Sequence, residues 1–287
     1  HHFRSACPFL VRAGQAPSGV MTRSSSAQQR NHARVVGRGD KTLVFSHGFG
    51  TDQTAWHQQE AAFAPDHRLV LFDLVGAGKS ELAAYSPRRY RTMHSYAADL
   101  LELLAELQLR EVIYVGHSMS GIIGLLAALQ EPERFAKLIF LSASPRYLND
   151  QGYTGGFEQA DIDALYAAMS SNYQAWASGF APIVAASPER PEVAAAFVAT
   201  LSAIRPDIAL AVARMVYQSD HRKDLSGLRV PTLIVQSSDD VAVPVAVGEY
   251  LARCIPGARY LLINAHGHLA HMSAAAEVNR AIRSFLD

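Results

Sequence analysis

The sequence has few of the features that mark secreted, membrane-spanning or nucleic-acid-binding proteins. Only two cysteines, Cys7 and Cys254, occur in 287 residues, and their wide separation excludes a disulfide framework and favours a reducing compartment. Lysine plus arginine and aspartate plus glutamate each total 26, so no net charge points to nucleic acid or an anionic membrane. No apolar run approaches the roughly 18 residues that span a bilayer. We therefore expect a cytoplasmic protein without nucleic-acid or membrane partners.

Signals for metals and cofactors are also missing. No Cys/His spacing typical of a metal site occurs, so we expect neither a metal nor a cofactor. The triplet Gly78-Lys79-Ser80 resembles the end of a P-loop, but Asp73 occupies the position of that motif's first glycine. We interpret this segment as a turn.

Residues 1–33 have the character of a tail. His1-His2 resembles the end of an affinity tag, and Met21 is a plausible natural start that precedes a polar stretch. The apolar patch at 9–11 is too short for the core of a signal peptide. We expect residues 1–33 to be a disordered tag and leader.

The stretch from Val112 to Gly124, V-I-Y-V-G-H-S-M-S-G-I-I-G, joins a strand pattern to an apolar helix pattern through a tight turn. A serine at such a turn is a nucleophile elbow, which raises the hydroxyl of Ser118 at the carboxyl edge of a sheet. The following helix offers free N–H groups and a positive dipole end to a developing oxyanion. Ser120 stands where the usual G-x-S-x-G pattern has its last glycine.

A second loop carries the other part of an oxyanion site. The buried strand pattern at 41–46 ends in H-G-F-G at 47–50, a loop that supplies one oxyanion donor in α/β-hydrolases. The predicted donors are the backbone N–H groups of Phe49 and Met119, and Phe49 would also form part of the pocket floor. We interpret His47 as a packing residue without a role in proton transfer.

Strand-like and helix-like segments alternate along much of the chain. Each strand-like segment is a near-continuous apolar run, typical of a parallel sheet with helices on both faces, so the expected fold class is α/β. The expected strands are 34–36, 41–46, 68–72, 112–115, 137–142, 232–236 and 260–263. The expected helices around them are 52–63, 95–107, the one after Ser118, and 275–286.

The alternation stops between residues 146 and 224. Only helical patterns occur there, at 159–169, 173–180, 191–203 and 206–218, which predicts an all-helical lid inserted into a core of residues 34–145 and 225–287. Most aromatic residues of the lid would hold its helices together. The residues assigned to an apolar pocket over Ser118 are Phe49, Phe157, Trp176, Phe180 and Val241.

Two further loops complete a candidate catalytic triad. The strand at 232–236 is followed by Asp239 and Asp240, and we select Asp240 because it begins the pattern D-x-x-x-P. The last strand is followed by three histidines, His266, His268 and His271, of which we select His268, directly after Gly267. The chain order Ser118, Asp240, His268 is that of α/β-hydrolases, in which the histidine acts as general base and the aspartate orients it.

The sequence resembles a group of α/β-hydrolases that includes the bacterial RsbQ stress regulators and the plant strigolactone and karrikin receptors. The shared segments include H-G-F-G-T-D-Q at 47–53, G-H-S-M-S-G at 116–121, S-A-S-P-R-Y-L-N-D at 142–150, S-D-H-R-K-D-L at 219–225 and G-H-L-A-H-M-S at 267–273. The resemblance implies a V-shaped, four-helix lid over an apolar cavity, and the same three triad residues. It looks closer to the bacterial branch, and it departs from the group at Met119, where valine is expected, and at Ala270, where proline is expected.

These observations predict a serine hydrolase of the carboxylesterase or lactonase type that cleaves small apolar esters. The resemblance also suggests an alternative, a ligand-sensing hydrolase that acts through a regulatory protein partner. A third possibility keeps the fold but changes the chemistry to C–C bond hydrolysis or perhydrolysis.

Overall fold

The centre of the protein is one seven-stranded sheet. The computed structural model describes residues 25–287, and the strand order is β1-β3-β2-β4-β5-β6-β7. All neighbouring strands are parallel except β1 and β3, which pair antiparallel. The strands are β1 (Arg34–Gly37), β2 (Thr42–Ser46), β3 (Arg68–Phe72), β4 (Val112–His117), β5 (Phe135–Leu141), β6 (Thr232–Asp239) and β7 (Arg259–His266). The predicted α/β class with a mostly parallel sheet is confirmed.

The folded part of the chain begins earlier than the sequence predicts. Residues Ala27–Arg30 form the short helix α1, and the carboxylate of Glu106 accepts hydrogen bonds from the Ala27 and Gln28 N–H groups at 2.7 and 3.0 Å. The expectation of a disordered tail up to residue 33 is therefore wrong for residues 25–33, because Glu106 supplies acceptors for the free amides of this first turn. The rest of that expectation falls on residues 1–24, outside the described residues.

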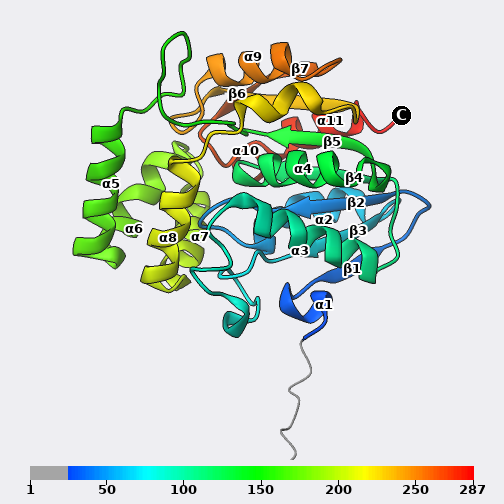
Figure 1. The fold of residues 1–287 in the computed structure, drawn as a ribbon, viewed down its shortest axis with the longest axis horizontal. Coiled ribbons are helices and arrows are strands. Elements are labelled where there is room, and N and C mark those ends of the chain that lie inside the picture. The colour runs from blue at the N-terminus through cyan, green and yellow to red at the C-terminus, as the bar shows by residue number, and fades with distance from the viewer. Residues whose placement is uncertain (1–24) are drawn as a thin grey trace, which may run out of the picture.

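Helices cover both faces of the sheet (Figure 1). Successive side chains of β2 point to opposite faces of the sheet. Val44 therefore packs in one apolar cluster, and Leu43 and Phe45 pack in another. The first cluster includes side chains of α3 (Met93–Glu106), α4 (Met119–Gln130) and α9 (Val245–Cys254). The second includes side chains of α2 (His57–Phe63) and α11 (Ala275–Arg283). Both faces of β2 are thus buried, as the apolar strand patterns predict.

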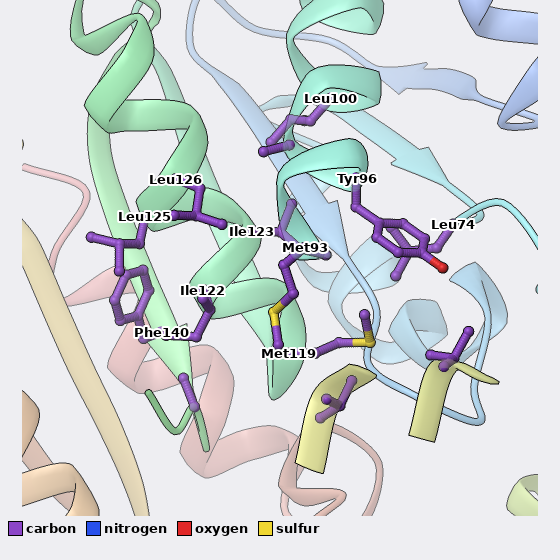
Figure 2. Packing of buried hydrophobic residues seen from close by; sticks show 14 of the residues in the cluster. Leu74, Met93, Tyr96, Leu100, Met119, Ile122, Ile123, Leu125, Leu126 and Phe140 are labelled. Carbon is purple, nitrogen blue, oxygen red and sulfur yellow. The ribbon is translucent and has the colours of Figure 1, made fainter. Parts of the chain in front are cut away.

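Helix α4 is buried on nearly every side. Ten of its twelve residues are buried. Its residues Ile122, Ile123, Leu125 and Leu126 lie between Phe140 of β5 and the α3 residues Met93 and Leu100 (Figure 2). The strand that precedes it, β4, is buried along its whole length. The turn between β4 and α4 is therefore held in place at both ends by core packing.

Four helices follow β5 and precede β6, and we call them the insert. They are α5 (Gln159–Ser171), α6 (Tyr173–Ala185), α7 (Pro191–Ala203) and α8 (Pro206–Tyr217), and they gather at one end of the sheet (Figure 1). Within residues 25–287 no single helix is long and apolar enough to cross a membrane; α7 and α8 meet that criterion only together, as a pair bent by 107°.

Two elements differ from the expected helices. Helix α6 continues through Pro182 and ends at Ala185, after which Ala186 adopts a left-handed conformation with φ 43°. Proline removes one amide donor, and near the end of a helix that loss does not stop the last turn. Helix α9 was not among the expected helices, although its buried Val247 and Leu251 have helical spacing.

Two glycines in helices provide a matched test of this packing. A Cβ added at Gly124 in α4 would lie 2.3 Å from the Tyr114 ring, which is held by a hydrogen bond from its hydroxyl to the Ser120 carbonyl. A Cβ at Gly179 in α6 would meet nothing within 4 Å. We expect Gly124→Ala to lower the free energy of unfolding by roughly 1–3 kcal/mol and Gly179→Ala to raise it by about 0.5–1 kcal/mol.

Urea unfolding of the two variants and the wild type measures both changes. A stabilised Gly124→Ala variant would contradict the close packing of α4 on β4.

Candidate active site

Ser118 occupies a strained turn between β4 and α4. Its backbone has φ 55° and ψ −121°, a conformation that non-glycine residues rarely adopt and that is typical of functional sites. Small neighbours make the turn fit: a Cβ at Gly116 would lie 2.4 Å from the Ser120 carbonyl oxygen, and one at Gly121 would lie 2.6 Å from the Ala143 Cβ. The tight turn predicted from the sequence is therefore present.

The contacts of the Ser120 side chain explain why serine replaces the last glycine of the usual G-x-S-x-G pattern. Its hydroxyl donates a hydrogen bond to the His47 carbonyl and lies 2.9 Å from the Ser46 hydroxyl. The side chain is fully buried and makes these contacts with the end of β2. Serine at this position thus ties the elbow to the loop that carries Phe49.

The structure brings the three selected triad side chains together. His268 Nε2 lies 2.9 Å from Ser118 Oγ, and His268 Nδ1 lies 2.8 Å from Asp240 Oδ2. The other carboxylate oxygen of Asp240 accepts hydrogen bonds from the Ala242 and Val243 N–H groups. An acceptor at Nδ1 favours the tautomer that carries its proton there, which leaves Nε2 free to accept the proton of the serine hydroxyl.

The competing residues lie elsewhere. Asp239 and His266 contact each other at 3.3 Å, and their side chains are 68% and 63% exposed. His271 is fully buried and packs against Trp56 and His117 rather than against Ser118. Geometry therefore separates the three histidines and the two aspartates that the sequence left in competition.

The two predicted oxyanion donors are free to bind a ligand. Among residues 25–287 no acceptor pairs with the Phe49 or Met119 backbone N–H. His47 holds the Phe49 loop in place, because its Nε2 accepts from the Leu74 N–H at 2.9 Å and its Nδ1 donates to the Gly48 carbonyl at 2.8 Å. With both ring nitrogens engaged, His47 has the packing role that the sequence indicates.

A cavity of about 30 Å³ adjoins these donors. It is lined almost entirely by apolar side chains and by glycines, with Phe49 and Met119 on one side and Ile204, Ile208 and Val212 of the insert on the other. A space of this size holds one or two water molecules and no ester. A substrate larger than that requires the insert or its side chains to move.

The other four predicted pocket residues are not among those that line this cavity. Trp176 stacks on Phe180 at 4.7 Å, because the two are one helical turn apart on α6. Phe157 packs against Tyr217 of α8 at 6.0 Å. Val241 is 52% exposed, so its assignment to a buried pocket is wrong in this conformation.

Tyr147 is a site residue that the sequence analysis missed. Its hydroxyl lies 3.3 Å from Ser118 Oγ, and burial raises the pKa of this phenol to about 12. The group is therefore neutral near pH 7 and able to donate a hydrogen bond. It lies in the segment S-A-S-P-R-Y-L-N-D, which carries part of the family resemblance but no catalytic motif.

The insert is hydrogen-bonded to two of the candidate catalytic loops. The His268 N–H donates to the Val184 carbonyl at the end of α6, at 2.9 Å. Thr200 of α7 donates its hydroxyl proton to the Gly50 carbonyl, at 2.7 Å. The loop of His268 and the loop of Phe49 are thus both bonded to the insert.

A layer of buried histidines lies behind the base. His117 Nε2 donates to the His268 carbonyl at 2.7 Å, and its ring lies 4.3 Å from the ring of His271. Burial, reinforced by the neighbouring imidazoles, holds the pKa of His117 well below its usual value and lowers that of His271 to about 3. Both rings are therefore neutral near pH 7, and the neutral His117 supports the loop of His268. Among residues 25–287 no group of three or more His, Cys, Asp or Glu side chains could hold a metal.

The lowered pKa of His271 makes stability depend on pH. The unfolded chain binds a proton at this residue below about pH 6.5, whereas the folded protein does not bind it until about pH 3. The unfolding free energy should therefore fall as the pH drops through 6.5, by up to about 1.4 kcal/mol per pH unit for this one proton.

We expect His271→Phe to flatten that dependence. Urea unfolding between about pH 6.5 and 5, above most carboxylate pKa values, measures the slope, and the exposed His57, changed to Phe, serves as the control. Equal slopes for the wild type and His271→Phe would contradict a neutral buried His271.

Comparison with known proteins agrees with this geometry. A family model described as the alpha/beta hydrolase fold matches residues 41–275. The chain is similar to a probable esterase from Oryza sativa, with 47% identity over 86% of this chain and 92% of the relative. It is also similar to a karrikin insensitive 2 receptor from Petunia hybrida, with 44% identity over 86% and 92% of the two chains.

Solved structures give the same result. A hydrolase from Oleispira antarctica superposes with a TM-score of 0.88 and 33% identity, covering 90% of this chain and 95% of the other. The region that the family model matches contains the elbow, the insert and the His268 loop. The chain therefore belongs to the α/β hydrolase family.

Proposed function

We propose that the protein is a serine hydrolase that cleaves small apolar carboxylic esters or lactones. The observation that carries the proposal is the relay of two short contacts, 2.9 Å from Ser118 to His268 and 2.8 Å from His268 to Asp240. The esterase names of its relatives support the same reaction class. The apolar lining of the cavity beside Phe49 and Met119 favours an apolar acyl group.

The proposed mechanism follows from these contacts. His268 takes the proton of Ser118 as Oγ attacks the ester carbonyl, and Asp240 stabilises the resulting imidazolium. The negative oxygen of the tetrahedral intermediate accepts hydrogen bonds from the Phe49 and Met119 N–H groups. His268 then gives its proton to the leaving alcohol, and a water molecule activated by the same histidine hydrolyses the acyl-serine. In this scheme the insert acts as a lid that excludes other water.

Removal of the nucleophile tests the proposal. Ser118→Ala should reduce p-nitrophenyl acetate hydrolysis by about 10³-fold or more, and a phosphonate probe should add its mass to the wild type at Ser118 only. Ser237→Ala is the matched control, because this serine is also buried in the sheet and its hydroxyl has no described partner. Unchanged turnover by Ser118→Ala would refute the mechanism.

A second candidate function is that of a ligand sensor that hydrolyses slowly and acts through a protein partner. Two observations favour it: relatives are named receptors, and hydrogen bonds join the insert to the loops of Gly50 and His268, so a ligand that opens the cavity would alter the surface. The time course of p-nitrophenyl acetate hydrolysis separates the two functions. A rapid burst followed by very slow turnover supports the sensor, and sustained turnover supports the metabolic esterase.

Tyr147 is proposed to assist the reaction as a hydrogen-bond donor near Ser118. Tyr147→Phe removes one neutral hydrogen bond, which should lower kcat/KM by roughly 2- to 15-fold. Tyr153→Phe is the control, because that hydroxyl lies on the same segment but donates to the Arg146 carbonyl. If the two variants have equal kcat/KM values, Tyr147 has no special role at the site.

A further inference from the structure

A second, larger cavity lies away from Ser118. It is a groove of about 610 Å³ between the segment 87–94, which belongs to the core and enters α3, and the segment 211–221, which ends the insert. This volume is within the range of small-molecule sites. Its lining shares no residue with the cavity beside Phe49 and Met119.

The groove has an excess of positive charge. Arg91 and Arg214 line it from opposite walls, and neither forms an ion pair with a carboxylate among residues 25–287. The guanidinium of Arg214 lies over the Tyr166 ring at 5.3 Å, a contact that leaves its charge uncompensated. One carboxylate, Asp220, also lines the groove.

The charge of Asp220 is already compensated. Arg222 lies 2.8 Å and Arg146 lies 3.1 Å from its Oδ2 atom. These arginines, Arg222 above all, hold the pKa of Asp220 well below its usual range. The acid therefore does not cancel the field of Arg91 and Arg214.

The uncapped start of helix α3 points to the same ligand charge. His221 is only 8% exposed and lines the groove, but its Nδ1 contacts the Asp224 carboxylate at 3.1 Å, which in the neutral ring places the proton on Nδ1 and leaves Nε2 as an acceptor. The ring of His94 lies 5.7 Å from that of His221. Thr92, the N-cap of the 14-residue helix α3, also lines the groove and makes no side-chain capping bond. An uncapped helix N-terminus favours an anion.

Apolar side chains make up much of the remaining wall. Pro87, Met93 and Met215 line the groove together with the ring of Tyr90. Methionine adapts to ligands of different shape. A bare inorganic ion would leave this apolar part uncovered, whereas an anion with an apolar body would cover it.

We propose that this groove is a binding site for a small organic anion, one that carries a carboxylate or phosphate group on a short apolar body. Its charged group contacts Arg91 and Arg214. Because one wall is core and the other is insert, the bound anion holds the insert on the core and lowers hydrolysis of esters that need the insert to move. That last consequence rests on the proposed function, but the binding itself does not.

Isothermal titration calorimetry with phenyl phosphate and benzoate tests the site directly, with neutral benzamide for comparison. We expect phenyl phosphate to bind the wild type, and Arg91→Gln or Arg214→Gln to weaken binding by about 10-fold or more, since each removes a charged hydrogen bond. Arg88→Gln is the matched control, because it makes the same charge change on the same exposed segment but outside the groove lining. It should change affinity less than twofold.

Several results would overturn the proposal. They are the absence of binding of both phenyl phosphate and benzoate to the wild type, equal affinity for the bound anion in Arg91→Gln, Arg214→Gln and the wild type, an equal loss in Arg88→Gln, or equal binding of benzamide. Binding of benzoate alone or of phenyl phosphate alone would identify the preferred source of the charge and support the site. If the anion binds as expected but no p-nitrophenyl acetate is hydrolysed, the proposed function is wrong and the anion-binding site in the groove remains supported.

Discussion

The positive φ angle of Ser118 is the constraint on which the site depends. A serine does not hold this conformation unaided, because strain of this kind costs on the order of 1–3 kcal/mol. Here the turn is fixed on three sides: β4 and α4 are buried in the core, and the Ser118 N–H donates to the Leu141 carbonyl of β5 at 2.9 Å. The packing in Figure 2 around α4 therefore has a chemical consequence, since it aims one hydroxyl at His268.

The other members of the site are positioned by the same edge of the sheet. Asp240 follows β6 and His268 follows β7, and parallel neighbours deliver their carboxyl ends to one edge. The insert also supports the His268 loop. A Cβ at Gly267 would lie 2.0 Å from the Ala185 carbonyl of the insert. Glycine there lets the loop approach α6 closely enough for the His268 N–H to bond Val184.

Much of this arrangement follows from the sequence, and the reasons are physical. Apolar runs mark strands, so all seven strands were located, including β1 and β7, which are largely not buried. The chain order of Ser118, Asp240 and His268 is a sequence property. The antiparallel direction of β1 was not predicted, since an apolar run carries no direction. Tyr147 was missed because its contact with Ser118 depends on the path of the chain after β5.

Side-chain direction was the least predictable feature. Val241 follows the candidate acid directly, yet its side chain faces solvent because the turn is set by the two amides that bond Asp240. The rings of Trp176 and Phe180, both on α6, stack against each other. Apolar composition identifies such residues as packing partners but does not say whether the partner is a ligand or a neighbour on the same helix.

The small cavity beside the Phe49 and Met119 N–H groups links substrate binding to chemistry. A space of about 30 Å³ does not admit an ester until Ile204, Ile208 or their helices move. The same insert holds Gly50 through Thr200 and the His268 loop through Val184. Opening by a rigid displacement of the whole insert would therefore disturb the Phe49 loop and the His268 loop together. Opening confined to the ends of α7 and α8 would keep the bond to Val184 on α6, so the base could stay aligned while a substrate enters.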